Sequence, residues 1–151
     1  MRRKDKEIKD VAAIEDILSK AKLCRLALCE NNHPYVVPLC FGYQDNALYF
    51  HCAVEGKKLD IIRNNHHVCF EIDIDCEFIK TDQACDWGIK YKSVIGFGRA
   101  MFVEDVHNKR KALDVIMQHY AEGAFEYQAK AVENIVIIKV EIESMTGKQS
   151  V

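Results

Sequence analysis

The amino-acid sequence predicts a small antiparallel β-barrel with helices packed against it, and three observations favour this fold class. Six segments are rich in β-branched and aromatic residues, as strands are. Most of the segments between them are short and carry Asn, Asp, Gly or Pro, the residues of tight turns. Two further segments show the apolar spacing of amphipathic helices. Many strands with little helix between them favour an antiparallel sheet, and closing that sheet would remove its exposed edges.

The first half of the chain predicts one helix followed by four strands. Over residues 5–20, apolar side chains form one broad stripe at helical spacing with charged residues opposite, so this segment should pack on a core. The stripe consists of Ile8, Val11, Ala12, Ile14, Ile17 and Leu18. Strands are predicted over residues 23–29, 35–41, 47–53 and 68–74.

The second half begins with a strand over residues 91–103. Within it, Gly96 and Gly98 indicate a bulge, a bend, or the close approach of another backbone or a ligand. Asp105 is placed to cap a helix over residues 106–120, where apolar side chains recur at helical spacing.

One more strand and one irregular segment complete the chain. The final strand is predicted over residues 135–142. Residues 75–90 show no regular pattern and contain the one tryptophan, Trp87, close to Cys85. We expect a mobile loop or a lid there.

Length, charge and composition indicate one domain and exclude two classes of protein. With 151 residues, of which 49% are hydrophobic, the chain can bury a core of its own, so residues 1–151 should form a single domain. A formal net charge of −2 lacks the basic footprint of a nucleic-acid-binding protein. No apolar run is long enough for a secretory signal or a transmembrane span, so we expect a cytoplasmic protein that does not bind membranes.

The seven cysteines are an odd number and include no C-x-x-C pair, which argues against a disulfide framework or a structural zinc site. Four lie in apolar strand-like runs and are predicted to be buried, reduced thiols: Cys24, Cys40, Cys52 and Cys69. The best metal candidate is His66-His67-x-Cys69 with Cys76. Adjacent histidines on a strand point to opposite faces, so we expect no metal.

A helix that opens on Gly56-Lys57-Lys58 is the most informative local pattern. Backbone N–H groups at a helix N-terminus point outward at the positive end of the dipole, and two lysines add full charges, as a phosphate site requires. The same pattern is common on ordinary surfaces, where the lysines are only solvated. A planar ring could lie along the preceding strands, at residues 36–39 and 50–53, with its phosphate at the lysines.

Several blocks of the sequence follow one another in a distinctive order. After the N-terminal helix come PYVVPLCFGY, LYFHCAVEGKKLD, VCFEID, YKSVIGFGRAMFVED, a long helix and IIKVEIESMTGK. Together they resemble the FMN-binding split-barrel family, and within it the nitroimidazole-resistance (Nim) proteins and other pyridoxamine 5′-phosphate oxidase-like flavoproteins. The resemblance covers nearly the whole chain and implies a six-stranded antiparallel split β-barrel with flanking helices.

The resemblance also implies a homodimer with FMN at the subunit interface. The residues that it places at the cofactor are Val36, Val37, Pro38 and Leu39 at the isoalloxazine edge; Phe50, His51, Cys52 and Ala53 along the ribityl chain; Lys57 and Lys58 at the phosphate; and Tyr91, Ser93 and Val94 from the second subunit. An apolar wall with a few backbone donors suits a flat heterocycle, and a dry cleft protects reduced flavin from solvent.

Four side chains near these groups have open roles. His51 either hydrogen-bonds the ribityl or phosphate oxygens or lies on the outer barrel face. In Nim-like proteins a histidine near the flavin is thought to help handle the substrate, which makes His66 the catalytic candidate. Trp87 and Tyr91 either stack over the exposed flavin face or belong to a loop tucked on the barrel.

The C-terminus departs from the vitamin B6 oxidases proper. Those enzymes carry a basic, proline-containing signature there, which residues 143–148 of this chain, ESMTGK, do not show. Their phosphate-binding Arg-Lys pair is matched by Lys57-Lys58, which keeps the charge and loses the bidentate geometry of arginine. We therefore expect no B6 oxidase activity.

The resemblance predicts a cytoplasmic, homodimeric FMN oxidoreductase. It would reduce a small aromatic or nitroaromatic compound with electrons from a reduced nicotinamide or another donor. A non-catalytic carrier or sensor barrel that binds flavin or haem is one alternative. The other is a dimeric interaction module without a cofactor.

Overall fold

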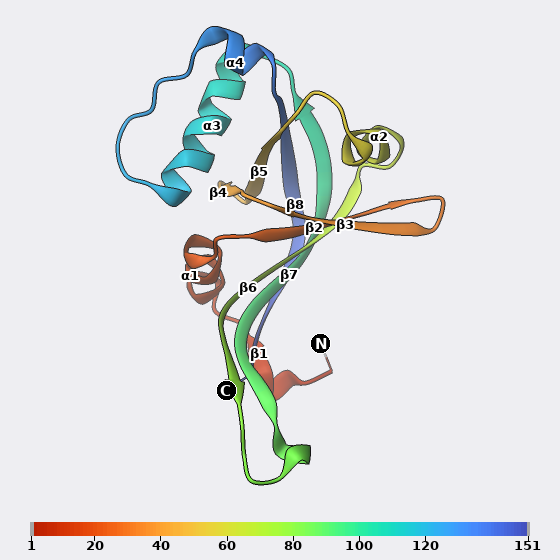
Figure 1. Cartoon of the computed structure of the whole chain (residues 1–151), viewed down its shortest axis with the longest axis vertical. Coiled ribbons are helices and arrows are strands. Elements are labelled where there is room, and N and C mark those ends of the chain that lie inside the picture. The colour runs from red at the N-terminus through yellow and green to blue at the C-terminus, as the bar shows by residue number, and fades with distance from the viewer. Residues whose placement is uncertain (1, 151) are drawn as a thin grey trace.

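The computed structural model describes residues 2–150, which form one strongly twisted antiparallel sheet with helices against both of its faces (Figure 1). The strands are β1 (Glu7–Ile8), β2 (Cys24–Glu30), β3 (His33–Leu39), β4 (Gly42–Gln44), β5 (Ala47–Cys52), β6 (His67–Ile79), β7 (Gly88–Val103) and β8 (Val136–Ser150). The helices are η1 (Lys4–Lys6), α1 (Val11–Lys20), α2 (Lys57–Asn64), η2 (Ala84–Asp86), α3 (Val106–Tyr120) and α4 (Ala129–Glu133).

The sheet confirms the predicted fold class and corrects the strand count. It has eight strands in the order β3-β2-β6-β7-β8-β5-β4, with β1 attached to β8, where six were predicted. The two additional strands, β1 and β4, have two and three residues, too few for an alternating pattern to appear in the sequence. Among residues 2–150, no helix has the length and apolarity to cross a membrane.

The main core lies on the inner face of the sheet, between the curled strands and helices α1 and α2. Its largest fully buried side chains include Phe41, Phe50, Phe70, Leu18 and Leu59. A second, smaller cluster lies on the outer face, where α3 and α4 cover the end of the sheet. Ile137 on β8 belongs to the outer cluster and its neighbour Ile138 to the inner core, as strand alternation requires.

The first helix is shorter than predicted, because Asp10 caps it. The Asp10 carboxylate accepts a hydrogen bond from the Ala13 N–H at 3.2 Å, and α1 begins at Val11. Ile8 therefore lies in β1, opposite Gly147 of β8, and not on the helical stripe. The third helix is as predicted, since Asp105 accepts from the Asn108 N–H at 2.9 Å.

The glycines of β7 confirm the predicted bulge and close approach. The pairing of β7 with β8 shifts register between Phe97 and Gly98, and a Cβ on Gly98 would lie 2.3 Å from the Glu141 carbonyl oxygen. A Cβ on Gly96 would lie 2.2 Å from the ring of Phe70. Both positions therefore require glycine for packing.

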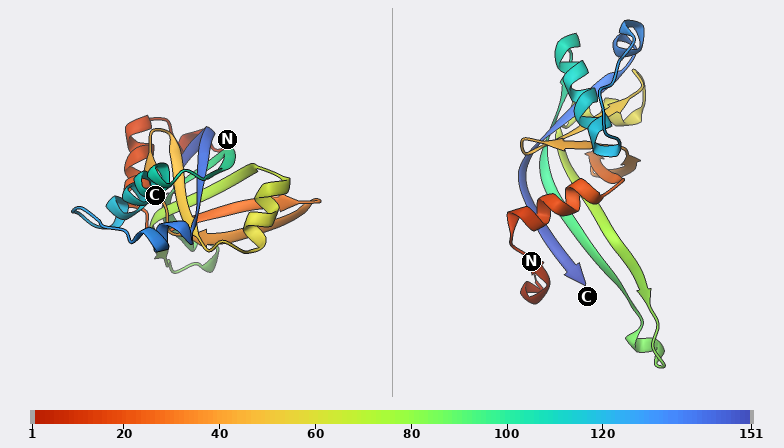
Figure 2. Two further views of the ribbon diagram at one scale, coloured as in Figure 1. Left: turned by 90° about the horizontal axis from the view of Figure 1, so that it is seen from above. Right: turned by 90° about the vertical axis from the view of Figure 1, so that its left-hand side faces the viewer.

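The segment expected to be a loop or lid is mostly a two-stranded arm. Strands β6 and β7 remain paired as far as Ile79 and Gly88, beyond a bulge between Ile74 and Glu77. The last pair of β7 with β8 is Tyr91 with Ser150, so the arm extends past the third strand (Figure 2). The alternation of apolar and polar residues was not evident in this part of the sequence, because the bulge breaks it and charged residues interrupt it.

The two ends of the sheet differ in chemistry. β3 is one end of the strand order and pairs only with β2, and it contains Pro34 and Pro38. β4 is the other end, and it lies under α3, so close that a Cβ on Gly42 would lie 2.6 Å from the Val115 carbonyl oxygen.

All seven cysteines are free thiols. Cys24 is buried, and burial raises its pKa; Cys52 and Cys69 are half-buried. Cys40 is exposed, which contradicts the predicted burial. It directly follows Leu39, the last residue of β3.

Candidate functional site

Helix α2 begins as the phosphate-site prediction requires. Its N-cap is Gly56, with φ of 146°, a backbone conformation that favours glycine. No side chain caps this end, in contrast to α1 and α3, which Asp10 and Asp105 cap. The N–H groups of Leu59 and Asp60 bond the Gly56 carbonyl oxygen, so those of Lys57 and Lys58 remain available to an anion beside the two lysine side chains.

Strand β3 and the end of β5 meet this helix start. The Nζ atom of Lys57 lies 4.9 Å from the centre of the Tyr35 ring on β3. Burial raises the pKa of the Cys52 thiol at the end of β5, and the nearby charge of Lys58 opposes that rise. The three predicted segments therefore converge on one corner of the molecule. Tyr35 was missed from sequence, although it lies within the block PYVVPL; only the fold shows that it faces Lys57.

The predicted β3 residues do not form a single wall. Val37 and Leu39 point inward and pack against the main core, whereas Val36 and Pro38 point outward and are exposed. A ring that lies along β3 would contact either the outer pair of side chains or the backbone edge, but not all four side chains.

Two predicted cofactor residues have side chains in the core, so the prediction for them concerns their backbone. Phe50 and Val94 are fully buried, so only their backbone could contact a ligand. His51 is exposed on the opposite face of β5 from Phe50, and Ala53 is exposed just after the strand. This exposure agrees with the interpretation that His51 lies on the outer face of the barrel.

Tyr91 and Ser93 lie in a different part of the chain, in a surface pocket of about 340 Å³. The residues that line it are Glu71, Asp73, Cys76, Ile89, Tyr91, Ser93, Ile95 and Lys148. His67, the first residue of β6 after α2, pairs with Arg99 of β7. Tyr91 lies eight residues before Arg99 on the same strand, toward the arm. At about 3.3 Å per residue this separation is roughly 26 Å. One chain therefore does not bring the two predicted sets of cofactor residues together.

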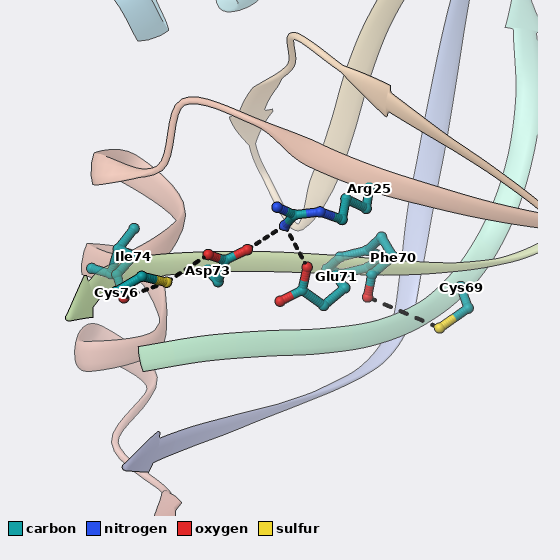
Figure 3. Close-up of polar contacts among 7 residues, drawn as sticks. All are labelled: Arg25, Cys69, Phe70, Glu71, Asp73, Ile74 and Cys76. Carbon is teal, nitrogen blue, oxygen red and sulfur yellow. Dashed lines mark hydrogen bonds and ion pairs between the residues drawn. The ribbon is translucent and has the colours of Figure 1, made fainter. Parts of the chain in front are cut away.

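A network of charged side chains borders this pocket (Figure 3). The Arg25 guanidinium on β2 donates to Glu71 at 2.9 Å and also to Asp73, both on β6. The Cys76 thiol donates to the other oxygen of Asp73 at 2.9 Å. Hydrogen bonds from Cys76 and Arg25 lower the pKa of Asp73, and the bond to Asp73 raises the pKa of Cys76. Burial raises the pKa of Glu71.

The candidate catalytic residue His66 lies away from both sets. It is exposed at the end of α2 opposite the lysines, and its ring stacks on that of His67 with centroids 4.7 Å apart. Helix α2 separates it from Lys57 by roughly 12 Å, at about 1.5 Å per residue. Within residues 2–150, no three His, Cys, Asp or Glu side chains are arranged to hold a metal ion. The catalytic role of His66 stays a prediction.

Trp87 lies at the tip of the arm, on neither the barrel nor a lid. Its indole N–H donates to the Thr81 carbonyl oxygen at 2.8 Å, and its ring meets that of Phe78 edge-on at 5.7 Å. Phe78, Trp87 and Ile89 all remain exposed. The tip is thus ordered by local contacts and presents apolar surface.

Comparison with known proteins places this geometry in a family. Residues 10–149 match the family model described as pyridoxamine 5′-phosphate oxidase. A crystal structure of a candidate 5-nitroimidazole antibiotic resistance protein from Bacteroides thetaiotaomicron is 35% identical, with a TM-score of 0.85 over 95% of this chain and 86% of that one.

Two further relatives extend the comparison. An FAD-binding protein from Mesorhizobium loti is 26% identical, with a TM-score of 0.68 over 94% of this chain and 96% of that one. An uncharacterised protein from Rhizobium meliloti is 32% identical over 85 residues, which are 56% of this chain. The match covers only 49% of that protein, about half of its length.

Proposed function

Since this chain belongs to the pyridoxamine 5′-phosphate oxidase family, we propose that it is a flavoprotein oxidoreductase that binds FMN between two copies of itself. The flavin would supply the electron chemistry, and the protein would position a small aromatic or nitroaromatic substrate against it. The observation that carries this proposal is the uncapped start of α2, with Lys57 and Lys58 beside Tyr35.

The helix start favours FMN among the flavins. FMN ends in a phosphate that carries close to two negative charges, and a helix N-terminus flanked by two lysines complements such a group. Asp60 in the first turn weakens this attraction, but Arg63 neutralises it through an ion pair at 2.8 Å. The relative from Mesorhizobium loti is described as FAD-binding, so FAD is the first competitor to test.

The homodimer is supported by an uncovered sheet face. On the outer side of β3 and β7, the side chains of Val36, Ile95 and Phe97 are 56%, 44% and 55% exposed. Exposed apolar side chains grouped on one face of a sheet are typical of a protein interface. In one chain the α2 lysines and Tyr91 are far apart, whereas two chains that face each other could bring them to the same flavin.

Substrate reduction also needs an electron donor, for which a reduced nicotinamide is the first choice. Flavin chemistry does not require an acid–base pair from the protein.

A lysine double variant tests the cofactor site. Lys57→Ala with Lys58→Ala should lower FMN affinity roughly 10- to 100-fold, because two charge-assisted contacts to the phosphate are lost. The measurement is a fluorescence titration with FMN, with retained flavin absorbance after gel filtration as a check. Lys4→Ala with Lys130→Ala, which changes two exposed lysines outside α2, is the matched control and should bind FMN normally.

A protein that is colourless and takes up neither FMN nor FAD would contradict the proposal. If FMN binds, anaerobic mixing with reduced nicotinamide and then with a nitroaromatic compound tests turnover. Bleaching followed by reoxidation supports a reductase. Flavin that binds and stays oxidised would instead indicate a carrier or sensor.

A further inference from the structure

A hollow of about 440 Å³ lies on the outer face of the sheet, between α3 and the turn that joins β4 to β5. Strand pairing places Tyr49 of β5 opposite Lys139 of β8, and both side chains line the floor. Gln44 and Asp45 of the turn line one end. Sites for small organic molecules in proteins have volumes of this order.

Helix α3 forms the wall above this floor. Asn108, Lys111 and Val115 line the hollow at the spacing of one helix face. Val115 lies at the end where the turn is, because β4 touches the helix there: a Cβ on Gly42 would lie 2.6 Å from the Val115 carbonyl oxygen. The wall thus presents an apolar side chain beside the turn, and then an ammonium and an amide group.

The hollow is separate from the proposed flavin site and from the uncovered apolar face. Tyr49 packs against the outer cluster, whereas its neighbour Phe50 belongs to the main core on the inner face, together with residues of α2. Figure 1 shows α2 and α3 on opposite sides of the sheet. The residues that line the hollow include none that was predicted at the cofactor, and neither Ile95 nor Phe97. A ligand here would not be the flavin held by α2 of the same chain.

Most polar side chains of the hollow have no partner in the protein. Within residues 2–150, this holds for the side chains of Gln44, Asp45, Tyr49, Asn108 and Lys111, which form neither hydrogen bonds nor ion pairs. They come from the turn, from β5 and from α3, and they surround one space. Their donors and acceptors therefore remain available to a ligand.

The charges of the hollow favour an anion. Lys139 donates to Glu141 at 3.0 Å, and this bond raises the pKa of Lys139, so its ammonium group stays charged at neutral pH. Two of its three hydrogens remain for a ligand. Together with Lys111, the hollow has two ammonium groups, against the single carboxylate of Asp45 among the residues that line it.

We propose that this hollow binds an adenine nucleotide. The base would lie against the Tyr49 ring, and the amide of Gln44 offers a donor beside an acceptor, the pattern that matches the edge of adenine. The carboxylate of Asp45 would accept hydrogen bonds from the ribose hydroxyls. The ammonium groups of Lys111 and Lys139 would bind the phosphate. This site goes beyond the proposed function, because binding a nucleotide here does not require flavin.

The first experiment measures binding of AMP to the purified protein by calorimetry. Lys111→Met should weaken binding about tenfold and Gln44→Met about threefold, because the first removes a charged donor to the phosphate and the second a neutral contact to the base. Lys130→Met is the matched control, since Lys130 is an exposed lysine of the neighbouring helix α4 that does not line the hollow. Equal affinity in all four proteins, or no binding to the parent protein, would overturn the proposal.

The second experiment reads the position of the ligand through Lys111. Chemical acetylation of the lysines is followed by peptide mass mapping, with and without AMP. Saturating AMP should slow the acetylation of Lys111 at least about threefold and leave that of Lys130 unchanged, since only Lys111 would be covered by the phosphate. Inorganic phosphate at the same concentration should protect Lys111 much less. Equal protection by phosphate and AMP would indicate a general anion site and overturn the proposal.

Free AMP and the adenine half of a dinucleotide share this chemistry, so the protection of Lys111 is also measured with reduced nicotinamide adenine dinucleotide and with FAD. Protection by AMP alone would uphold the site with a free nucleotide as its ligand. Protection by a dinucleotide that competes with AMP would uphold it with the dinucleotide as the source.

FMN also carries a ring and a phosphate, and it serves as the control for the flavin site. If FMN protects Lys111 as well as AMP does, also in the Lys57→Ala, Lys58→Ala variant, the hollow belongs to the flavin and the proposal is wrong. Protection by AMP in a protein that takes up no flavin would uphold the hollow and refute the proposed flavoprotein.

Discussion

The outer face of the sheet is covered by helices at one end and left uncovered at the other. At the covered end, Ile116 of α3 and Ile137 of β8 are almost completely buried with Val132 of α4. At the other end, Ile95 and Phe97 of β7 lie on the same face and remain about half exposed. Both regions have apolar side chains on an antiparallel sheet, so the local sequence does not predict which of them is covered.

The difference lies in what the chain supplies to cover each region. Helices α3 and α4 follow β7 directly and fold back over its last residues, which completes the smaller, outer-face cluster within one chain. No helix of residues 2–150 packs over Ile95 and Phe97. The first region should therefore determine the stability of the single chain, and the second should determine its association.

The largest effect is expected at the covered end. Ile116→Ala should lower the free energy of unfolding by about 3 kcal/mol, because Ile116 is 1% exposed and its removal leaves a cavity. Urea unfolding followed by circular dichroism measures this change. Ile116→Val, which removes one methyl group, should cost only about 1 kcal/mol. If both variants unfold like the parent protein, α3 is not a stabilising cover.

At the uncovered end, a change should affect association and leave folding nearly intact. Phe97→Ser should raise the dimer dissociation constant at least tenfold, about 1.4 kcal/mol, since an apolar contact at the centre of the interface is lost. Sedimentation velocity over a range of concentrations is the measurement. Val106→Ser is the control, because Val106 is 47% exposed on α3, away from this face. Equal dissociation constants for the two variants would place the interface elsewhere.

The smallest effect is expected where the covering helix ends. The Tyr120 hydroxyl donates to the Lys22 carbonyl oxygen at 3.0 Å and accepts from the Phe41 N–H at 2.9 Å, which ties α3 to two other segments. Tyr120→Phe should cost about 1 kcal/mol at neutral pH. Urea unfolding at pH 7 measures it, and no loss would show that α3 is held by apolar contacts alone.

The pH dependence of the same variant sharpens the test. Burial raises the pKa of Tyr120 from 10.0 to about 12. A group whose folded-state pKa is raised contributes its stability below its unfolded pKa and loses it as the pH rises toward the folded one. The stability difference between parent and Tyr120→Phe should thus be constant up to about pH 10 and shrink between pH 10 and 12.

Local signals in the sequence predicted the elements that depend on local chemistry. The bounds of α3 were predicted because Asp105 caps it, and the start of α2 was evident from Gly56-Lys57-Lys58. The outer-face row of Asp73, Ser93 and Lys148 was not predicted as a unit, since it exists only through the register of three strands. The burial of Phe50 and Val94 was missed for a related reason: an apolar strand residue does not reveal which face it occupies.

The prolines of β3 limit how copies of this chain can join. Pro34 and Pro38 have no N–H, so they fit a ladder only where the backbone points away from the neighbouring strand. Of the alternate positions 34, 36 and 38, only Val36 then has a donor for an incoming strand. The β3 edge of this sheet therefore resists growth by strand addition, which disfavours open-ended filaments built on that edge.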